Sequence, residues 1–176
     1  MSARIVLSGV LIGVLSGSVA RAGDAPPSAR PPEPEALQAL KKLAGTWQGS
    51  AKMGDKMVPV TIVYEATAGG SAVLERLFPG TPHEMVSVYT ADGGGVAMTH
   101  YCTLGNHPKM VLKKADTHAL SFELTGTDGL RSAAEPHMHA MTISFVDGDH
   151  IRETWTSFAG GKPKEDKLFE LARAPQ

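Results

Sequence analysis

The sequence predicts an all-β fold, an antiparallel meander of about ten strands closed into a barrel, with one short helix before it. From Gly45 onward, apolar and polar residues alternate with the period of two that is typical of strands. Glycine, proline and aspartate separate the alternating segments at short intervals, as a series of hairpins requires. Closure into a barrel is expected because it removes the two exposed edges of such a sheet.

The first 22 residues have the pattern of a signal peptide. Arg4 supplies a positive charge, residues 5–20 form an uncharged and largely apolar run, and small residues occupy positions 20 and 22. This run is shorter than the roughly 20 strongly apolar residues of a membrane-spanning helix. We therefore expect cleavage after Ala22, no stable membrane anchor, and an exported protein that is periplasmic or secreted.

Residues 23–35 have the composition of a linker, because five prolines stand among small and acidic residues. We expect this segment to be extended or disordered. A single barrel domain then covers residues 36–176. It begins with a short amphipathic helix in which Leu37, Leu40 and Leu43 recur at helical spacing, with Pro34 suited to the start and Gly45 to the end.

Ten segments after this helix have the pattern of strands. Glycine-containing turns such as residues 92–95 and 160–161 lie between them, and residues 125–136 form a longer connection that we expect to cross one mouth of the barrel. The expected strands are residues 47–52, 58–66, 71–78, 84–90, 96–104, 109–114, 119–124, 137–146, 151–158 and 166–173.

The charge balance gives no reason to expect a nucleic-acid partner. Removal of residues 1–22 takes away Arg4 and Arg21 and leaves 15 basic residues against 18 acidic ones, a formal charge of −3. Nucleic-acid binding needs a basic face. The single Cys102 cannot form an internal disulfide, so the stability of the domain must come from packing.

The chain resembles the lipocalin-like (calycin) barrels, including the nitrobindin-like ones. Residues 43–49, Leu-Ala-Gly-Thr-Trp-Gln-Gly, form a helix end that leads into a Gly-x-Trp strand, and residues 78–86 and 99–106 resemble a group of uncharacterised bacterial calycin-like proteins. The resemblance implies that a late basic residue, here Arg173, packs on Trp47. That group typically has an amide and an arginine where this chain has His107 and Lys109.

The most informative stretch is residues 96–104, where strand alternation coincides with the only cysteine. Val96, Met98, His100, Cys102 and Leu104 share one face of the expected strand. This face is apolar but carries an imidazole and a thiol. We expect the barrel to enclose a small, mostly apolar ligand. The residues expected to orient it are His100, Asn106, His139 and Trp155.

A metal site is the alternative interpretation. His137 and His139 alternate along a later strand as His100 and Cys102 do along the earlier one, so these four side chains could form a set of ligands for zinc or another late transition metal inside the barrel. The nitrobindin resemblance adds a haem hypothesis with His100 or His139 as the axial ligand. A c-type attachment is excluded because the chain has no Cys-x-x-Cys-His motif.

A third interpretation is a filled barrel that binds no ligand and serves as an interaction scaffold. The sequence contains no nucleophile elbow, Walker loop or dinucleotide fingerprint, which favours a binding protein over an enzyme. Glu153 could face either side of its strand. An inward Glu153 would need a partner, for which we consider Arg76.

Overall fold

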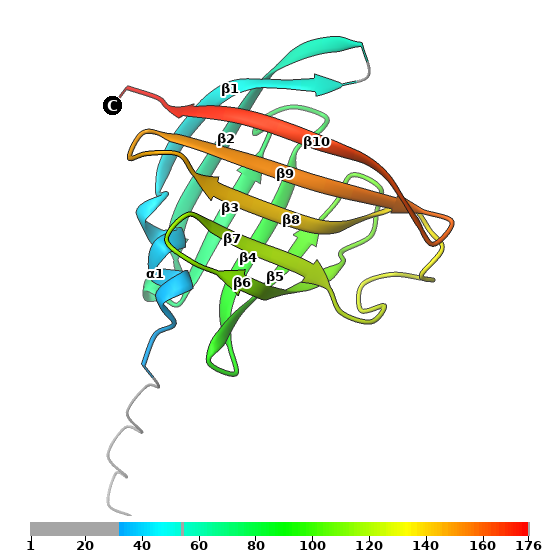
Figure 1. Ribbon diagram of the computed structural model, residues 1–176, viewed down its shortest axis with the longest axis horizontal. Helices are drawn as coiled ribbons and strands as arrows, with labels where there is room; N and C mark the ends of the chain where they lie inside the picture. The colour runs from blue at the N-terminus through cyan, green and yellow to red at the C-terminus, as the bar shows by residue number, and fades with distance from the viewer. Residues whose placement is uncertain (1–31, 54, 176) are drawn as a thin grey trace, which may run out of the picture. The chain divides into compact units, whose positions relative to one another are not determined.

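The computed structural model of the protein describes residues 32–53 and 55–175 and shows a closed antiparallel barrel (Figure 1). One helix, α1 (Glu35–Lys42), precedes the strands, and a single 3-10 turn, Ala68–Gly70, lies between the second and third strands. The ten strands are β1 (Gly45–Met53), β2 (Lys56–Thr67), β3 (Ala72–Leu77), β4 (Met85–Asp92), β5 (Gly95–Tyr101), β6 (Lys109–Ala115), β7 (Ala119–Leu124), β8 (His137–Phe145), β9 (His150–Ala159) and β10 (Lys162–Arg173).

Each strand pairs with its neighbours in the sequence, and β1 also pairs with β10 to close the ring. The predicted fold class and all ten predicted strands are therefore confirmed. The expected signal peptide and most of the expected linker lie outside the described residues, and α1 begins one residue inside that linker, at Glu35. None of the helices formed by residues 32–53 and 55–175 has the length and apolar character needed to cross a bilayer.

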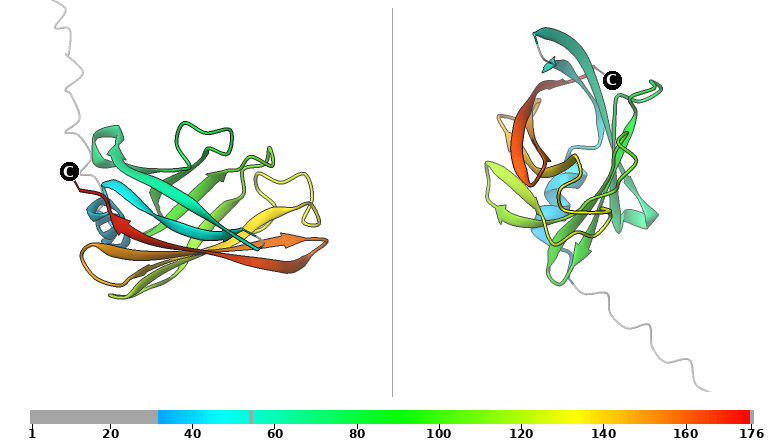
Figure 2. Two further views of the ribbon diagram at one scale, coloured as in Figure 1. Left: turned by 90° about the horizontal axis from the view of Figure 1, so that it is seen from above. Right: turned by 90° about the vertical axis from the view of Figure 1, so that its right-hand side faces the viewer.

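The helix α1 covers one end of the barrel (Figure 2). It buries Ala36, Leu37 and Leu40, which follow its helical period, so the expected apolar face is confirmed. Beyond the helix, Trp47 is fully buried and its indole nitrogen donates a hydrogen bond to the Leu43 carbonyl at 2.8 Å. The barrel interior is thus closed at this end.

Arg173 packs on Trp47, as the resemblance to calycin barrels implies. Its guanidinium carbon lies 4.3 Å from the centroid of the Trp47 ring. The same side chain donates hydrogen bonds to the carbonyl oxygens of Ala44 at 2.9 Å and Lys42 at 3.1 Å. A cation at the carbonyl end of a helix is electrostatically favourable. This contact ties the last strand to both the helix and the first strand.

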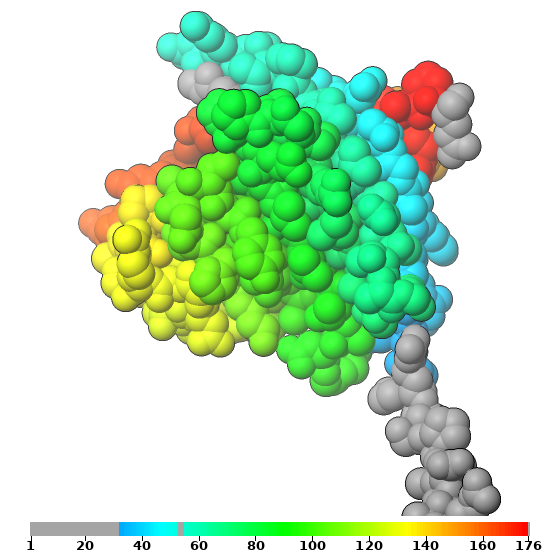
Figure 3. All heavy atoms as spheres, turned by 180° about the vertical axis from the view of Figure 1, so that it is seen from behind, coloured from blue at the N-terminus to red at the C-terminus, as the bar shows by residue number. Residues whose placement is uncertain are grey.

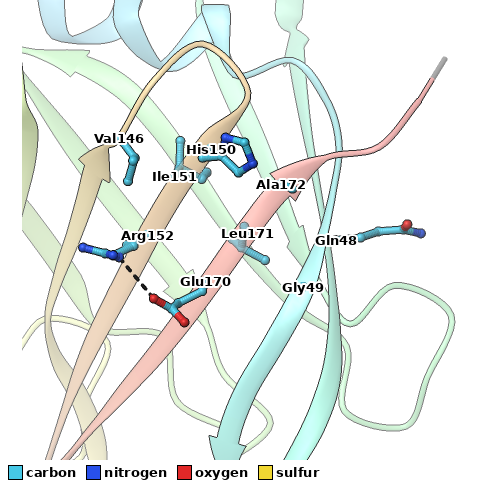
Figure 4. A pocket seen from close by; sticks show the side chains of 9 residues that line it. All are labelled: Gln48, Gly49, Val146, His150, Ile151, Arg152, Glu170, Leu171 and Ala172. Carbon is cyan, nitrogen blue, oxygen red and sulfur yellow. Dashed lines mark ion pairs between the residues drawn. The ribbon is translucent and has the colours of Figure 1, made fainter.

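Barrel closure depends on a close approach at Gly49. A Cβ atom at this position would lie 1.8 Å from the Glu170 carbonyl oxygen on β10, so only glycine fits. The outer surface over this seam is a shallow groove of about 310 Å³ across β1, β10 and β9 (Figure 4). Arg152 and Glu170 form an exposed ion pair there, with 3.3 Å between Nε and Oε1.

Strand β5 ends earlier than the alternation predicts. The backbone amide of Gly105 donates to the Cys102 carbonyl, and the amide of Cys102 donates to the Asn106 carbonyl, so residues 102–106 form a turn. Leu104 lies in this turn and is 51 % exposed. The prediction that the strand extends to Leu104 is therefore wrong, whereas Val96, Met98 and His100 are buried as expected.

A β-bulge in β8 changes which side chains face inward. His137 pairs with Phe158 and Met138 with Ser157, but Ala140 pairs with Thr156, so His139 is an extra residue in the strand. Because alternation is interrupted there, Met138 faces the interior side, while His137 and His139 pack against Phe158 on the outer side. The expectation that both histidines share the inward face of Met141 is wrong for this reason.

The connection at residues 125–136 lies at the end of the barrel opposite α1 (Figure 2). It packs beside the turn that follows β5, where it forms the yellow surface in Figure 3. The amide of His107 donates to the Gly129 carbonyl, and the Asn106 side chain donates to the Pro136 carbonyl at 2.8 Å and to Glu135 Oε1 at 3.1 Å. Asn106 is therefore an anchor for this connection.

Candidate functional site

A row of polar side chains crosses the inner wall on four adjacent strands. Tyr64 lies directly opposite Glu75, Glu75 opposite Ser87, and Ser87 opposite His100. Residues that face each other across antiparallel strands point to the same side of the sheet. All four side chains are buried. The barrel thus contains a polar layer within an otherwise apolar interior.

The opposite wall supplies two more members of this polar layer, Glu153 and Trp155 of β9. Tyr64 donates a hydrogen bond to Glu153 Oε1 at 2.6 Å, and the Trp155 indole nitrogen donates to Oε2 at 3.2 Å. Tyr89 of β4 donates to Glu75 Oε2 at 2.6 Å. Both carboxyl groups are fully buried and accept charge-assisted or short hydrogen bonds. The suggested partner of Glu153, Arg76, is instead exposed on the outside of β3.

Glu75 and Glu153 form a carboxyl pair that favours one shared proton. Burial, and then the charge of Glu153, raise the pKa of Glu75 well above its ordinary value. Burial also raises the pKa of Glu153, but hydrogen bonds from Tyr64, Trp155 and Glu75 oppose that shift. We therefore assign the proton to Glu75. Its Oε1 atom has no hydrogen-bond partner among the residues that the structure describes.

His100 of β5 is a further titratable group of the polar layer. Its Nδ1 atom lies 3.1 Å from the Ser87 hydroxyl, and its ring centroid lies 4.5 Å from that of Trp155. Burial lowers the pKa of His100 to about 4, so the imidazole is neutral at physiological pH. Within residues 32–53 and 55–175, His100 Nε2 has no hydrogen-bond partner. A buried ring nitrogen without a partner is unusual in a folded protein.

An open, largely apolar cavity of about 620 Å³ lies at the end of the barrel opposite α1. Cys102 and Met85, which line it, are each two residues from His100 and Ser87 on the same strand faces. The cavity therefore lies next to the polar layer, on the side that faces away from α1. Its lining includes Val58, Phe78, Met85, Cys102, Leu104 and Met138.

The structure brings two of the four expected ligand-orienting residues together. His100 and Trp155 are buried side by side below the cavity. Asn106 is buried but holds the 125–136 connection. His139 stacks on Phe158 with ring centroids 3.7 Å apart, on the outer side of the wall.

The four residues of the metal hypothesis are not gathered at one point. His137 Nε2 and His139 Nδ1 lie 3.2 Å apart beside Phe158 on the outer side of the wall, where His137 is also buried. His100 is buried inside the barrel, and Cys102 lines the cavity. Among the described positions, no group of three or more His, Cys, Asp or Glu side chains could hold a metal ion. The haem hypothesis with His139 as ligand likewise gains no support from this placement.

Sequence reasoning missed Glu75, Tyr64, Ser87 and Tyr89. A signal for Glu75 exists, because it stands at an inward position between Val73 and Leu77, both of which are buried. A carboxylate at the apolar phase of a strand indicates a buried partner. That partner, Glu153, follows much later in the chain, and pattern analysis does not pair strands that are distant in sequence.

Comparison with known proteins supports the fold. No family model and no curated protein matches the sequence. Rv2717c from M. tuberculosis has a similar structure, with a TM-score of 0.56 and 21 % identity over 80 % of this chain and 98 % of that one. A protein of unknown function of the DUF3598 family from Nostoc punctiforme is similar with a TM-score of 0.55 and 13 % identity over 77 % of this chain. The chain spans about half, 49 %, of that second protein.

Proposed function

We propose that this protein binds one small, mostly apolar molecule in the cavity at the open end of its barrel. The observation that carries the proposal is the cavity of about 620 Å³, lined largely by apolar side chains and lying directly above a buried polar layer. A volume of this size accommodates a small organic ligand. A closed barrel of this kind has room for a single such molecule.

His100 and Trp155 are the residues that would orient the ligand from below. The Nε2 atom of His100 has no hydrogen-bond partner among the described residues, so it can form a hydrogen bond with a ligand that displaces the side chains covering this atom. Trp155 provides an aromatic surface beside the His100 ring. Asn106 would act indirectly, by fixing the connection at residues 125–136. Because His139 stacks on Phe158 on the outer side of the wall, we expect it to make no direct contact with the ligand.

We further propose that the chain is a calycin-like protein that is exported to the periplasm or the exterior. The supporting observations are the Gly-x-Trp strand, the packing of Arg173 on Trp47, and the signal-peptide pattern of residues 1–22. The test of export is to express the full-length chain in its native host and to sequence the N-terminus of the protein recovered from each compartment. A new N-terminus at Gly23 supports export, and an intact N-terminus in the cytoplasm contradicts it.

The binding proposal is tested by titration with a neutral apolar fluorescent dye. Met138 lines the cavity, so Met138→Trp fills it and should abolish dye binding. Met57 is 64 % exposed, and Met57→Trp is the matched control that should bind as the wild type does. Saturable binding with one dye per chain supports the proposal. Absence of binding favours the filled scaffold, and equal binding by both variants places the dye outside the cavity and contradicts the proposal.

A further inference from the structure

We propose that the rim of the same cavity holds a second kind of ligand, a soft monovalent metal ion such as Cu(I), bound by sulfur atoms. The donors are the thiol of Cys102 and the thioether of Met85, with Met138 and His83 lining the same cavity. This site shares only Cys102 with the four-residue metal hypothesis drawn from the sequence. It does not depend on the apolar-ligand proposal.

Two sulfur atoms at the cavity rim are spaced to hold one ion between them. Cys102 Sγ lies 3.9 Å from Met85 Sδ. Two metal–sulfur bonds of about 2.3 Å that meet at roughly 120° place their sulfur atoms about 4 Å apart. An ion could therefore bind between these two atoms with little movement of the backbone.

The fold supplies the remaining donors from separate elements. Val86 pairs with Tyr101, so Met85, the first residue of β4, is a neighbour of Cys102, the residue that follows β5. The bulge in β8 turns Met138 toward the cavity. His83, in the exposed segment before β4, also borders the cavity. Methionine side chains have three rotatable bonds and adapt readily to an ion.

The chemistry of the lining favours Cu(I) over divalent ions. Thiolate and thioether sulfur are soft donors that select Cu(I), whereas oxygen donors suit Mg²⁺ and Ca²⁺. Among the described residues that line the cavity there is no aspartate or glutamate. Binding would release the Cys102 proton to solvent and pair one thiolate with one monovalent cation. The resulting site is neutral, whereas a divalent ion would leave a net charge in apolar surroundings.

The test is an anaerobic titration of the full mature chain with Cu(I) against a chromogenic Cu(I) chelator. We expect one ion per chain, with binding weakened about 100-fold by Cys102→Ser and about tenfold by Met85→Leu. Met110→Leu changes a fully buried methionine outside the cavity and should leave affinity unchanged. The double variant Met85→Leu/Met138→Leu keeps the volume similar and provides the same test if Cys102→Ser does not fold.

Two results would overturn the proposal. The first is a wild-type chain that cannot compete with the chelator. The second is Cu(I) binding that survives Cys102→Ser and the double methionine variant but is lost in His139→Ala, which would place the ion at the outer His137 and His139 pair.

Discussion

Glu75 and Glu153 approach each other inside the barrel from β3 and β9, strands that β2, β1 and β10 separate in the ring. Their pairing holds one proton on Glu75 in the folded protein, whereas both side chains would ionise independently in the unfolded chain. This difference couples folding to pH.

Between the unfolded and folded pKa values of Glu75, the folded state binds more protons than the unfolded state. The free energy of unfolding therefore falls as pH rises, by up to about 1.4 kcal/mol per pH unit for this group. Glu75→Gln removes the titration and should flatten the decline that begins as pH rises above about 4.5 in urea denaturation. Glu65→Gln, at an exposed site of β2, is the control and should keep the wild-type slope.

His100 has the opposite effect on pH dependence. Because burial lowers its pKa to about 4, the folded state binds fewer protons than the unfolded state as pH falls below about 6.5. The contribution of His100 to the free energy of unfolding is therefore complete above about pH 6.5 and is lost as pH falls toward 4. NMR titration should show a neutral His100 ring at pH 6. A His100 ring that protonates near pH 6.5 would contradict its burial.

Removal of the Arg173 side chain should weaken closure of the barrel. Arg173→Ala loses the cation–π contact with Trp47 and two hydrogen bonds to carbonyls at the helix end, at a cost of about 2 kcal/mol in the free energy of unfolding. Arg152→Ala removes an exposed ion pair with Glu170 and should change stability little. Equal effects of the two substitutions would show that the contact with Trp47 contributes nothing specific.

Gly49→Ala should be among the most damaging single substitutions in the barrel. The added Cβ meets a backbone carbonyl oxygen of β10 at 1.8 Å, which forces the two closing strands apart, and the expected loss is more than about 3 kcal/mol. Gly148→Ala is the control, because no atom lies within 4 Å of its new Cβ. A Gly49→Ala protein with wild-type thermal stability would contradict the observed closure.

Most of the fold could be predicted from local patterns, but much of the site could not. Alternation located each strand, and the resemblance to calycin barrels implied the contact between Trp47 and Arg173. No sequence signal marks the bulge in β8, because the extra residue there, His139, is neither glycine nor proline. One inserted residue reversed the direction of His137 and His139 and so removed half of the expected metal ligands from the interior.

The most direct test of ligand binding in the cavity uses the single cysteine as a reporter. Cys102 lines the cavity, so a bound apolar molecule should shield its thiol from a small neutral alkylating reagent. We predict that labelling slows at least tenfold at saturating dye, with half-protection at the dye concentration that half-saturates the protein. Dye binding that leaves the Cys102 labelling rate unchanged would place the ligand elsewhere and contradict the account.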